Sequence, residues 1–439
     1  MSSNTQETQE VFDAIVIGGG PAGATCASRM AAQGHTVLLV EKTQFPRFHI
    51  GESLVPYLTQ AFHMMGLLEQ IEHGPFVHKY GVELALQDNS VRRVEFINVA
   101  PGQRPLAFNT DRAALDHVLL EACTRAGGQV RTQAEVQGVL FDGERIAGIT
   151  YTQGGQNHVA RARVVVDASG RAGLIAKQFR LRKMNPRLHN VAIFQQFRNL
   201  IKENNPSPEG DLVLSSHPEG WLWGIPLGPD ALSLGAVMPA AVLKGRNPQA
   251  VFTEHLSRAP RLLQRVQGAR PVFEPIKVES DYCYHAERLA GPGYFIVGDA
   301  GCFVDPVFSG GVYLSVVCGM KAAEVIDEIL RGGDETKART YFENFCKTGY
   351  DSYFRLVYAF YESCANDIGR ILYFFSPGNF PFFLQTMCGD FWGRPDQPVL
   401  HFLRARPEWA TFAEPFELIY ECPIYPETCY TVENMAMPH

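Results

Sequence analysis

Apolar runs alternate with a helical pattern at the start of the chain. Residues 11–17 are mostly apolar, residues 22–33 repeat apolar positions at helical spacing, and residues 35–40 are apolar again. A strand, a helix and a second strand in this order predict a βαβ unit with parallel strands. The run 164–166, which leads into Asp167, predicts a strand buried on both faces that returns to the same sheet.

A different pattern follows in the middle and at the end of the chain. Short strand-like runs predict a large second sheet, and they cover residues 82–86, 91–97, 191–197, 212–215, 220–226 and 232–238. Beyond Gly333, residues 336–368 have helical spacing and residues 372–392 are rich in aromatic side chains. We interpret this end as a helical cap over a substrate pocket; ordinary core packing is the alternative.

These patterns predict an α/β fold of more than one domain, since 439 residues exceed what one compact core holds. We expect a Rossmann-like nucleotide-binding domain, a large-sheet substrate domain and a helical C-terminal region. The expected bounds are 1–79, 111–185 and 280–332 for the first domain, 80–110 and 186–279 for the second, and 333–439 for the third.

Composition narrows the function classes. A net charge of −7 with 19% charged residues favours neither nucleic acid nor an acidic surface as a partner. The ten cysteines form no C-x-x-C pair, so we expect no metal site and reduced thiols. Residues 1–10 do not resemble a targeting peptide, and no apolar run approaches the roughly 20 residues that span a bilayer. The expectation is a cytoplasmic protein with no membrane partner.

The first candidate site is the glycine-rich turn after residue 17. Gly18, Gly20 and Gly23 have G-x-G-x-x-G spacing and open the first predicted helix together with Ala22. Such a turn lets backbone N–H groups at a helix start approach a pyrophosphate. Glu41 ends the second strand, where a carboxylate accepts hydrogen bonds from a ribose. The motif predicts a dinucleotide site; a purely structural βαβ turn is the alternative.

The segment after Glu41 carries the first resemblance to a known family. Arg47 could pair with a pyrophosphate and Ser53 could cap the next helix, although a capped surface loop explains both. Taken together, the glycine motif, the acidic strand end and Arg-x-x-Ile-Gly-Glu-Ser at residues 47–53 resemble the flavoprotein monooxygenase superfamily, and within it the flavin-dependent halogenases.

The resemblance implies FAD as cofactor and a set of residues around it. Arg112 would contact the flavin from a helix start, with a helix-cap salt bridge as the alternative, and Asp299 would bind the ribityl hydroxyls. The full implied set is Gly18, Gly20, Ala22, Gly23, Glu41, Lys42, Arg47, Ile50, Gly51, Glu52, Ser53, Arg112, Asp299 and Val312.

Lys79 is the implied catalytic residue. Lys79-Tyr80-Gly81 resembles the Lys-x-Gly segment that supplies the catalytic lysine of the halogenases. The alternative is one more solvated lysine, as most lysines are. The resemblance also implies a chloride or bromide site at the amides of Gly310 and Gly311, where a glycine-rich helix start that only packs closely is the alternative.

The stretch 221–226 decides the predicted class. Trp221, Trp223 and Pro226 form Trp-x-Trp-x-Ile-Pro, which resembles the motif that separates flavin-dependent halogenases from hydroxylating monooxygenases and lines a tunnel beside the flavin. Alone, two tryptophans on one strand face would indicate core packing. Phe308 stands where tryptophan halogenases have glutamate, which argues against free tryptophan and for phenols, pyrroles or carrier-bound acyl groups.

The predicted reaction follows from the resemblance. Asp167 and Gly170 are separated where NADPH-dependent hydroxylases have a tight Asp-Gly pair, which favours FADH2 from a separate flavin reductase. We expect FADH2, O2 and halide to give a flavin hydroperoxide and then hypohalous acid, which Lys79 directs at an electron-rich aromatic substrate, free or on an acyl or peptidyl carrier protein. The alternatives are a halide-independent flavin monooxygenase, a flavin-dependent reductase, or an FAD-binding sensor without turnover.

Overall fold

The structure is a computed structural model of the whole chain. It describes residues 10–85, 90–96, 106–205, 207–208, 210–280, 282–366, 378–393, 397–421 and 423–424. Part of the aromatic stretch predicted at 372–392 therefore lies outside the described residues.

The first sheet confirms the predicted βαβ unit. Strand β1 (Glu10–Ile17) pairs in parallel with β2 (Val37–Val40), and α1 (Pro21–Ala32) connects them. The other edge of β1 pairs in parallel with β10 (Gln156–Asp167), so the run at 164–166 returns to this sheet as predicted. The path continues through β20 (Tyr294–Ile296) and β19 (Ala290–Gly291) on one side and β7 (Gln129–Arg131) on the other.

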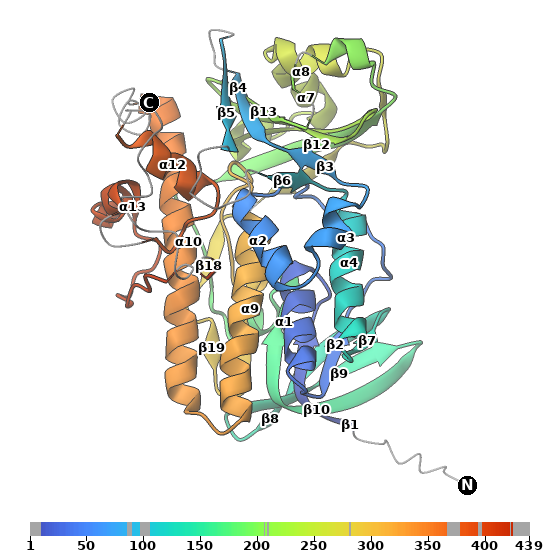
Figure 1. Cartoon of the computed structure of the whole chain (residues 1–439), viewed down its shortest axis with the longest axis vertical. Coiled ribbons are helices and arrows are strands. Elements are labelled where there is room, and N and C mark those ends of the chain that lie inside the picture. Colours follow the sequence, from blue (N-terminus) through green and yellow to red (C-terminus); the bar gives the residue numbers. More distant parts are fainter. Residues whose placement is uncertain are drawn as a thin grey trace.

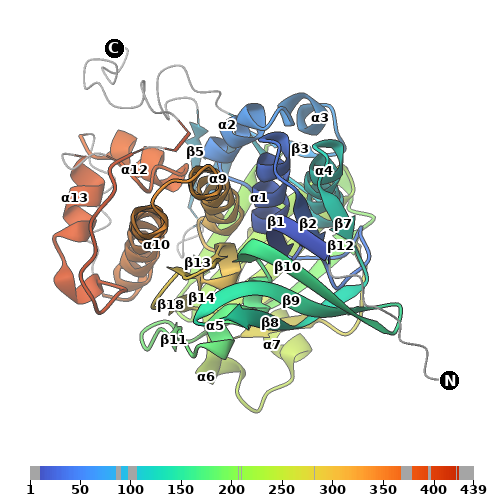
Figure 2. The ribbon, with the colours of Figure 1, turned by 90° about the horizontal axis from the view of Figure 1, so that it is seen from below.

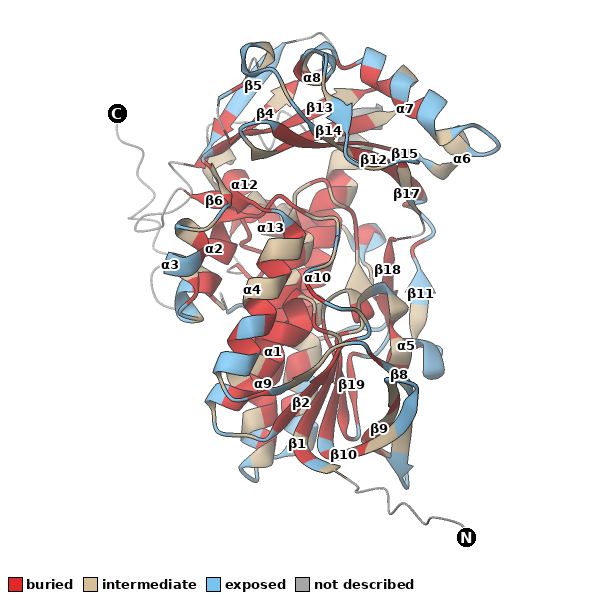
Figure 3. Cartoon of the chain, turned by 90° about the vertical axis from the view of Figure 1, so that its right-hand side faces the viewer, coloured by how far each residue is buried: buried red, intermediate tan, exposed pale blue. Residues whose placement is uncertain are grey.

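Helices cover one face of this sheet. Figure 2 shows α10 (Glu335–Asn366), α9 (Gly310–Leu330), α1 and α4 (Arg112–Arg125) in one layer above the strands, while β8 (Ala134–Asp142) and β9 (Arg145–Gln153) lie on the opposite side. Buried residues fill the space between α1, α9 and strands β1, β2 and β10 (Figure 3). This tight layer fixes the end of β1, where the glycine turn lies.

The second sheet confirms the predicted strand-rich region. Its order is β16-β12-β15-β14-β13-β4-β5, with β17 also pairing with β12. The strands are β4 (Gly81–Ala85), β5 (Val91–Glu95), β12 (Asn190–Arg198), β13 (Leu212–His217), β14 (Gly220–Gly228), β15 (Ala231–Pro239), β16 (Arg270–Pro271) and β17 (Lys277–Ser280). In Figure 1 this sheet lies above the first domain, with α7 (Pro248–Ser257) and α8 (Pro260–Arg265) on its outer side.

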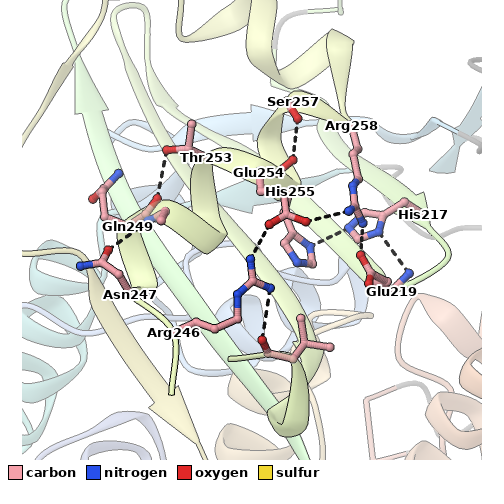
Figure 4. A network of polar contacts seen from close by, with 12 residues as sticks. His217, Glu219, Arg246, Asn247, Gln249, Thr253, Glu254, His255, Ser257 and Arg258 are labelled. Atoms are coloured by element: carbon pink, nitrogen blue, oxygen red, sulfur yellow. Dashed lines mark hydrogen bonds and ion pairs between the residues drawn. The ribbon is translucent and has the colours of Figure 1, made fainter. Parts of the chain in front are cut away.

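A polar network holds α7 against the outer face of the second sheet (Figure 4). His255 Nδ1 on α7 lies 2.9 Å from His217 Nε2 on β13. Arg258, which follows α7, pairs with Glu219 in the β13–β14 hairpin and with Glu254 one turn back. These contacts tie α7 to the β13–β14 hairpin.

Short elements join the two domains. A two-stranded sheet of β3 (Val77–Lys79) and β6 (Ala107–Asn109) lies between them, after α2 (Pro56–Met64) and α3 (Leu68–Glu72). A further small sheet consists of β11 (Arg182–Met184), β18 (Tyr284–Ala286) and β21 (Cys302–Phe303). The 3-10 turn η4 (Gly298–Ala300) follows β20, and α5 (Leu174–Gln178) follows β10.

The C-terminal region is helical, as predicted. The 32-residue helix α10 packs against α9, and α13 (Pro398–Arg404) packs on α10 and on α12 (Phe380–Met387). Trp392 is fully buried and stacks on Phe345 of α10 with ring centroids 4.7 Å apart. Trp392 therefore packs in the core, which is the alternative stated above for the aromatic stretch. None of the helices in the described ranges has the length and apolarity needed to cross a bilayer.

Gly235 of β15 leaves the space that Trp223 occupies. A Cβ at position 235 would lie 2.2 Å from Trp223 Cζ2. We predict that Gly235→Ala lowers the free energy of unfolding by about 1–3 kcal/mol, because overpacking must displace the indole or the strand. Urea denaturation followed by tryptophan fluorescence measures this.

The matched control is Gly138→Ala in β8, where the nearest atom to a new Cβ is Thr150 Oγ1 at 3.7 Å. We expect this variant to change stability by less than about 0.5 kcal/mol. Equal losses in the two variants would contradict the packing argument.

Candidate active site

The glycine turn after β1 leaves no room for a side chain at Gly18 or Gly23. Gly18 has a φ of +104°, and a Cβ there would lie 2.3 Å from Ala168 O. A Cβ at Gly23 would lie 2.0 Å from Gly18 O, so the start of α1 packs directly on the turn. At Gly20 the nearest atom to a Cβ would be Arg47 Nη2, at 3.6 Å. The turn thus faces a guanidinium rather than packed core, which suits an anion at a helix start.

Glu41 is held at the edge of this turn. Its carboxylate accepts hydrogen bonds from Gly19 N–H and Thr43 N–H, both at 2.8 Å. These bonds fix the orientation of a buried carboxylate directly after β2, where the sequence predicts the ribose. The neighbouring Lys42 side chain is exposed.

A buried ion-pair cluster connects the predicted cofactor arginines. Arg112 donates from Nε to Asp116 Oδ1 at 2.8 Å, and Arg47 Nη1 lies 3.2 Å from Asp116 Oδ2. Arg112 Nη1 also donates to Ile50 O at 2.8 Å. The alternative of a helix salt bridge therefore holds for Arg112 and Asp116. The same arginine also contacts Ile50 and Gly51 of the segment predicted to bind the cofactor. Sequence reasoning missed Asp116, although its i,i+4 spacing from Arg112 was a usable signal.

Three separate segments meet at Gly51. Gly51 has a φ of +103°, and a Cβ there would lie 2.8 Å from Arg112 Nη1 and 3.9 Å from Val312 Cγ2. The buried Glu52 accepts from Gly51 N–H at 3.1 Å and from Gln196 Nε2 of β12 at 3.2 Å. The fold thus brings the predicted residues of the loop, α4 and α9 together, and it connects them to the second sheet.

A small cavity lies beside Asp299, and it is lined in part by Gly298, Asp299, Gly311, Leu314, Ser315 and Tyr353. Asp299 Oδ1 lies 3.5 Å from Ser315 Oγ. Burial raises the pKa of the Asp299 carboxyl to about 6, while the positive charge of Arg112 opposes this rise. The lining is mainly apolar, with Asp299 and Ser315 among its polar side chains.

Lys79 is the last residue of β3, and only 2% of it is exposed. Its Nζ donates to Ser53 Oγ at 2.9 Å and to Leu54 O at 3.0 Å. Burial lowers the Lys79 pKa to about 8, because the ammonium loses its hydration. The alternative of a solvated lysine is therefore wrong.

The structure corrects the interpretation of Ser53. Its hydroxyl accepts from the Lys79 ammonium and does not cap α2, where Val55 is the N-cap residue. The Ser53 hydroxyl thus helps to hold the lysine in place. The local pattern of a serine before a helix suggested a cap.

The two tryptophans of β14 are buried side by side, with ring centroids 5.9 Å apart. Trp221 Nε1 donates to the hydroxyl of Tyr361 on α10 at 2.9 Å, and Trp223 Nε1 donates to Ser233 Oγ at 3.3 Å. Strand β14 contacts β3 and β6, so the tryptophans and Lys79 belong to neighbouring strands. Pro226 is buried next to the bulge that ends the β14–β15 pairing.

The helix start predicted to bind halide already has one protein acceptor. Helix α9 begins at Gly310 after Ser309, whose φ is +58°. Gly310 N–H donates to the Tyr353 hydroxyl at 3.2 Å, whereas Gly311 lines the cavity beside Asp299. Phe308 is half-buried, with its ring 5.6 Å from that of Phe360. Of the two predicted amides, only that of Gly311 has no acceptor among the described contacts.

Among the residues that the structure describes, no cluster of three or more His, Cys, Asp or Glu side chains could hold a metal ion.

Comparisons with known proteins show the family of this chain. Residues 13–90 and 84–367 match the model of the tryptophan halogenase family. A tryptophan 2-halogenase of Chondromyces crocatus is 34% identical over 363 residues, which are 79% of this chain and 67% of that protein. A 1H-pyrrole-2-carbonyl peptidyl-carrier-protein chlorinase of Pseudomonas fluorescens is 29% identical over 377 residues, which are 80% of this chain and 84% of that protein.

A comparison with solved structures also finds flavin-dependent halogenases. The structure of the myxobacterial chondrochloren halogenase CndH, described as a new variant of FAD-dependent halogenases, aligns with a TM-score of 0.76 and 30% identity over 92% of this chain and 100% of that chain. Fold and nucleotide site thus define a flavoprotein oxidoreductase. The chain belongs to the tryptophan halogenase family and is a flavin-dependent halogenase. The predicted class of enzyme is confirmed.

We predict that Arg47→Ala weakens FAD binding by about tenfold, since a guanidinium beside the glycine turn is lost as a charged partner of the pyrophosphate. Asp116 keeps Arg112 as a partner, so the variant retains its fold. Titration of the apoprotein with FAD, followed by flavin fluorescence, measures the affinity. The control is Arg161→Ala, an exposed arginine of β10, and equal affinities in both variants would refute the role of Arg47.

The lowered pKa of Lys79 predicts a pH dependence of stability relative to Lys79→Met. The native protein releases this proton near pH 8 and the unfolded chain near 10.5. Between these values the unfolded state binds more protons, so the wild type gains stability over the variant as pH rises. From pH 8 to pH 10 we expect a gain on the order of 2 kcal/mol in the difference between their urea unfolding free energies. A constant difference would show that the buried lysine titrates normally.

Proposed function

We propose that this enzyme halogenates an electron-rich aromatic ring, a phenol or a pyrrole, free or attached to a carrier protein, with Lys79 as the catalytic residue. The observation that carries the proposal is the buried Lys79 ammonium, on a strand next to the tryptophan strand β14. Burying a charge costs free energy unless the charge is fully paired. A buried ammonium that is not fully paired is therefore a candidate functional group. The described contacts give Lys79 two oxygen acceptors and no carboxylate.

The residues around the glycine turn fit FAD. The amides of Gly18 to Gly23 and Arg47 would hold its pyrophosphate, Glu41 its ribose and Asp299 its ribityl chain. Bound reduced flavin supplies, with O2, the oxidising equivalents that convert chloride or bromide into an electrophilic halogen species. The start of α9, with Gly311 and the Gly310–Tyr353 pair, would hold the halide before oxidation.

The hydrogen bonds of Lys79 define what the lysine does. An ammonium has three N–H donors, and Ser53 and Leu54 accept two of them. The third donor remains to bind the oxygen of hypohalous acid, which orients the halogen toward the ring and makes the oxygen a better leaving group. The neutral amine has only two N–H groups, and both would already be used.

The tryptophans separate the two halves of the reaction. Trp221 and Trp223 are buried, and their indole nitrogens donate to Tyr361 and Ser233, so the two rings form a wall that keeps an aromatic substrate from the flavin side. A small oxidant passes such a wall where a ring does not. This favours halogenation at Lys79 over oxygen transfer at the flavin.

Two observations support the partners. The side chain of Asp167 is fully buried and accepts from Ser169 N–H, Ser169 Oγ and Ile175 N–H, so it is engaged within the protein and is not exposed to NADPH. This supports a separate flavin reductase. Relatives named as pyrrolyl-carrier-protein chlorinase and brominase support a pyrrole on a carrier protein. The relative named for tryptophan requires free tryptophan in any substrate panel.

We predict that Lys79→Met lowers halogenated product by about 10²-fold or more, while reduced flavin is oxidised within about twofold of the wild-type rate. Methionine keeps most of the volume and removes only the donors. The assay supplies FAD, a flavin reductase and bromide to a panel of free and carrier-tethered phenols, pyrroles and tryptophan, and reads mass shifts.

The matched control is Lys177→Met, an exposed lysine on α5, which should leave product formation unchanged. Retained halogenation by Lys79→Met would remove Lys79 from the mechanism. A wild type that consumes reduced flavin but brominates no ring in the panel would sink the proposed substrate class.

A further inference from the structure

Asp305 is a buried carboxyl residue that the proposed reaction does not use. It lies between β21 and α9, five residues before Gly310, and is only 2% exposed. Its Oδ1 accepts from Val307 N–H at 3.1 Å, and its Oδ2 accepts from the Tyr361 hydroxyl at 2.9 Å and lies 3.4 Å from Asn190 Nδ2 of β12. One carboxyl thus joins the loop before α9, helix α10 and the second sheet.

Tyr361 extends this contact to the tunnel wall. Its hydroxyl donates its one hydrogen to Asp305 and accepts the indole N–H of Trp221 at 2.9 Å. An indole nitrogen only donates, so the chain of hydrogen bonds runs in one direction, from Trp221 through Tyr361 to Asp305. The Trp221 ring has its polar edge fixed by this chain and is tilted by 48° against the ring of Trp223.

A second tyrosine of α10 ties the same loop to the predicted halide amides. The Tyr353 hydroxyl donates to Asp305 O at 2.8 Å and accepts from Gly310 N–H at 3.2 Å. The two tyrosines are eight residues apart on α10 and hold both the backbone and the side chain of Asp305. The loop beside the halide site and the tryptophan strand therefore share one anchor.

Asp305 is a buried, ionisable acceptor of hydrogen bonds. Burial raises the pKa of its carboxyl to about 7, and the hydrogen bond from Tyr361 opposes this rise. Tyr282 lies near the same carboxyl, as does Cys283. Tyr282 is a neutral phenol, and burial raises its pKa further above the ordinary range.

We propose that Asp305 and Tyr361 are positioning residues that hold the Trp221 indole in the wall between the start of α9 and Lys79. With the indole held, oxidised halide passes to Lys79; with the indole released, water enters and the oxidant is lost before it meets the ring. The inference rests on the proposed function, because it concerns the yield of that reaction.

Tyr361→Phe tests the inference, since it removes one hydroxyl and leaves the ring. We expect the rate of reduced-flavin oxidation to stay within about twofold and the halogenated product per flavin oxidised to fall by about fivefold or more. The Trp221 component of the fluorescence, isolated in the apoprotein by subtracting the spectrum of Trp221→Phe, should change as well. This second readout does not depend on turnover.

The matched control is Tyr341→Phe on the same helix, where the lost hydroxyl bonds a different carboxylate, that of Glu421, at 2.5 Å. It should leave both the Trp221 signal and the product yield unchanged. Asp305→Asn serves as the second variant. Its amide oxygen can accept from Val307 N–H or from Tyr361 but leaves an N–H facing the other donor, so the same two changes are expected.

The outcomes separate the two proposals. An unchanged Trp221 signal or an unchanged yield in both Tyr361→Phe and Asp305→Asn would overturn the positioning role, and so would equal changes in Tyr341→Phe. If the wild type brominates none of the offered rings, the proposed function fails. The Trp221 signal of Tyr361→Phe still decides in that case whether the hydrogen-bond chain holds the indole.

Discussion

The burial of the Lys79 ammonium is the constraint on which the site depends. Taking a charge out of water costs several kcal/mol, and only well-placed acceptors offset that cost. Both acceptors come from Ser53 and Leu54, in the segment that directly follows Gly51 and Glu52. The position of the lysine is therefore tied to the loop that contacts Arg112 and Val312. In the proposed mechanism, the lysine and the cofactor would therefore depend on the same stretch of backbone.

That piece of backbone also joins the two sheets. Glu52 accepts from Gln196 of the second sheet, and Asn109 of β6 donates to Gly210 O at 2.8 Å beside β13. Since each of these buried groups would lose a partner if the domains moved apart, the contact between them is specific in geometry as well as apolar. A fixed separation of the two sheets is what the proposed transfer of an oxidant to Lys79 would require.

The sequence predicted the parts of this arrangement that local patterns encode. Strand and helix periodicity gave the βαβ unit and the return of residues 164–166 to the first sheet, and glycine spacing gave the turn at Gly18. Family resemblance, not periodicity, singled out Lys79. The pairs that sequence reasoning missed join remote segments: Tyr361 with Trp221, Tyr353 with Gly310 and Gln196 with Glu52. Ser53 was interpreted as a helix cap because its actual partner, Lys79, lies 26 residues further on and outside the local pattern.

Two tyrosines of helix α10 contact the candidate site, Tyr353 at Gly310 and Tyr361 at Trp221. A halide at the start of α9 has fewer free donors than the two glycines suggest, because Tyr353 accepts the Gly310 N–H. Replacing that neutral hydrogen bond costs about 1 kcal/mol, whereas an anion at a helix start gains both the amide and the dipole. Halide binding is therefore compatible with this helix start, but the halide would compete with the Tyr353 hydroxyl for the Gly310 N–H. Since Tyr361 of the same helix accepts from Trp221, we propose that the C-terminal region also forms part of the tryptophan wall.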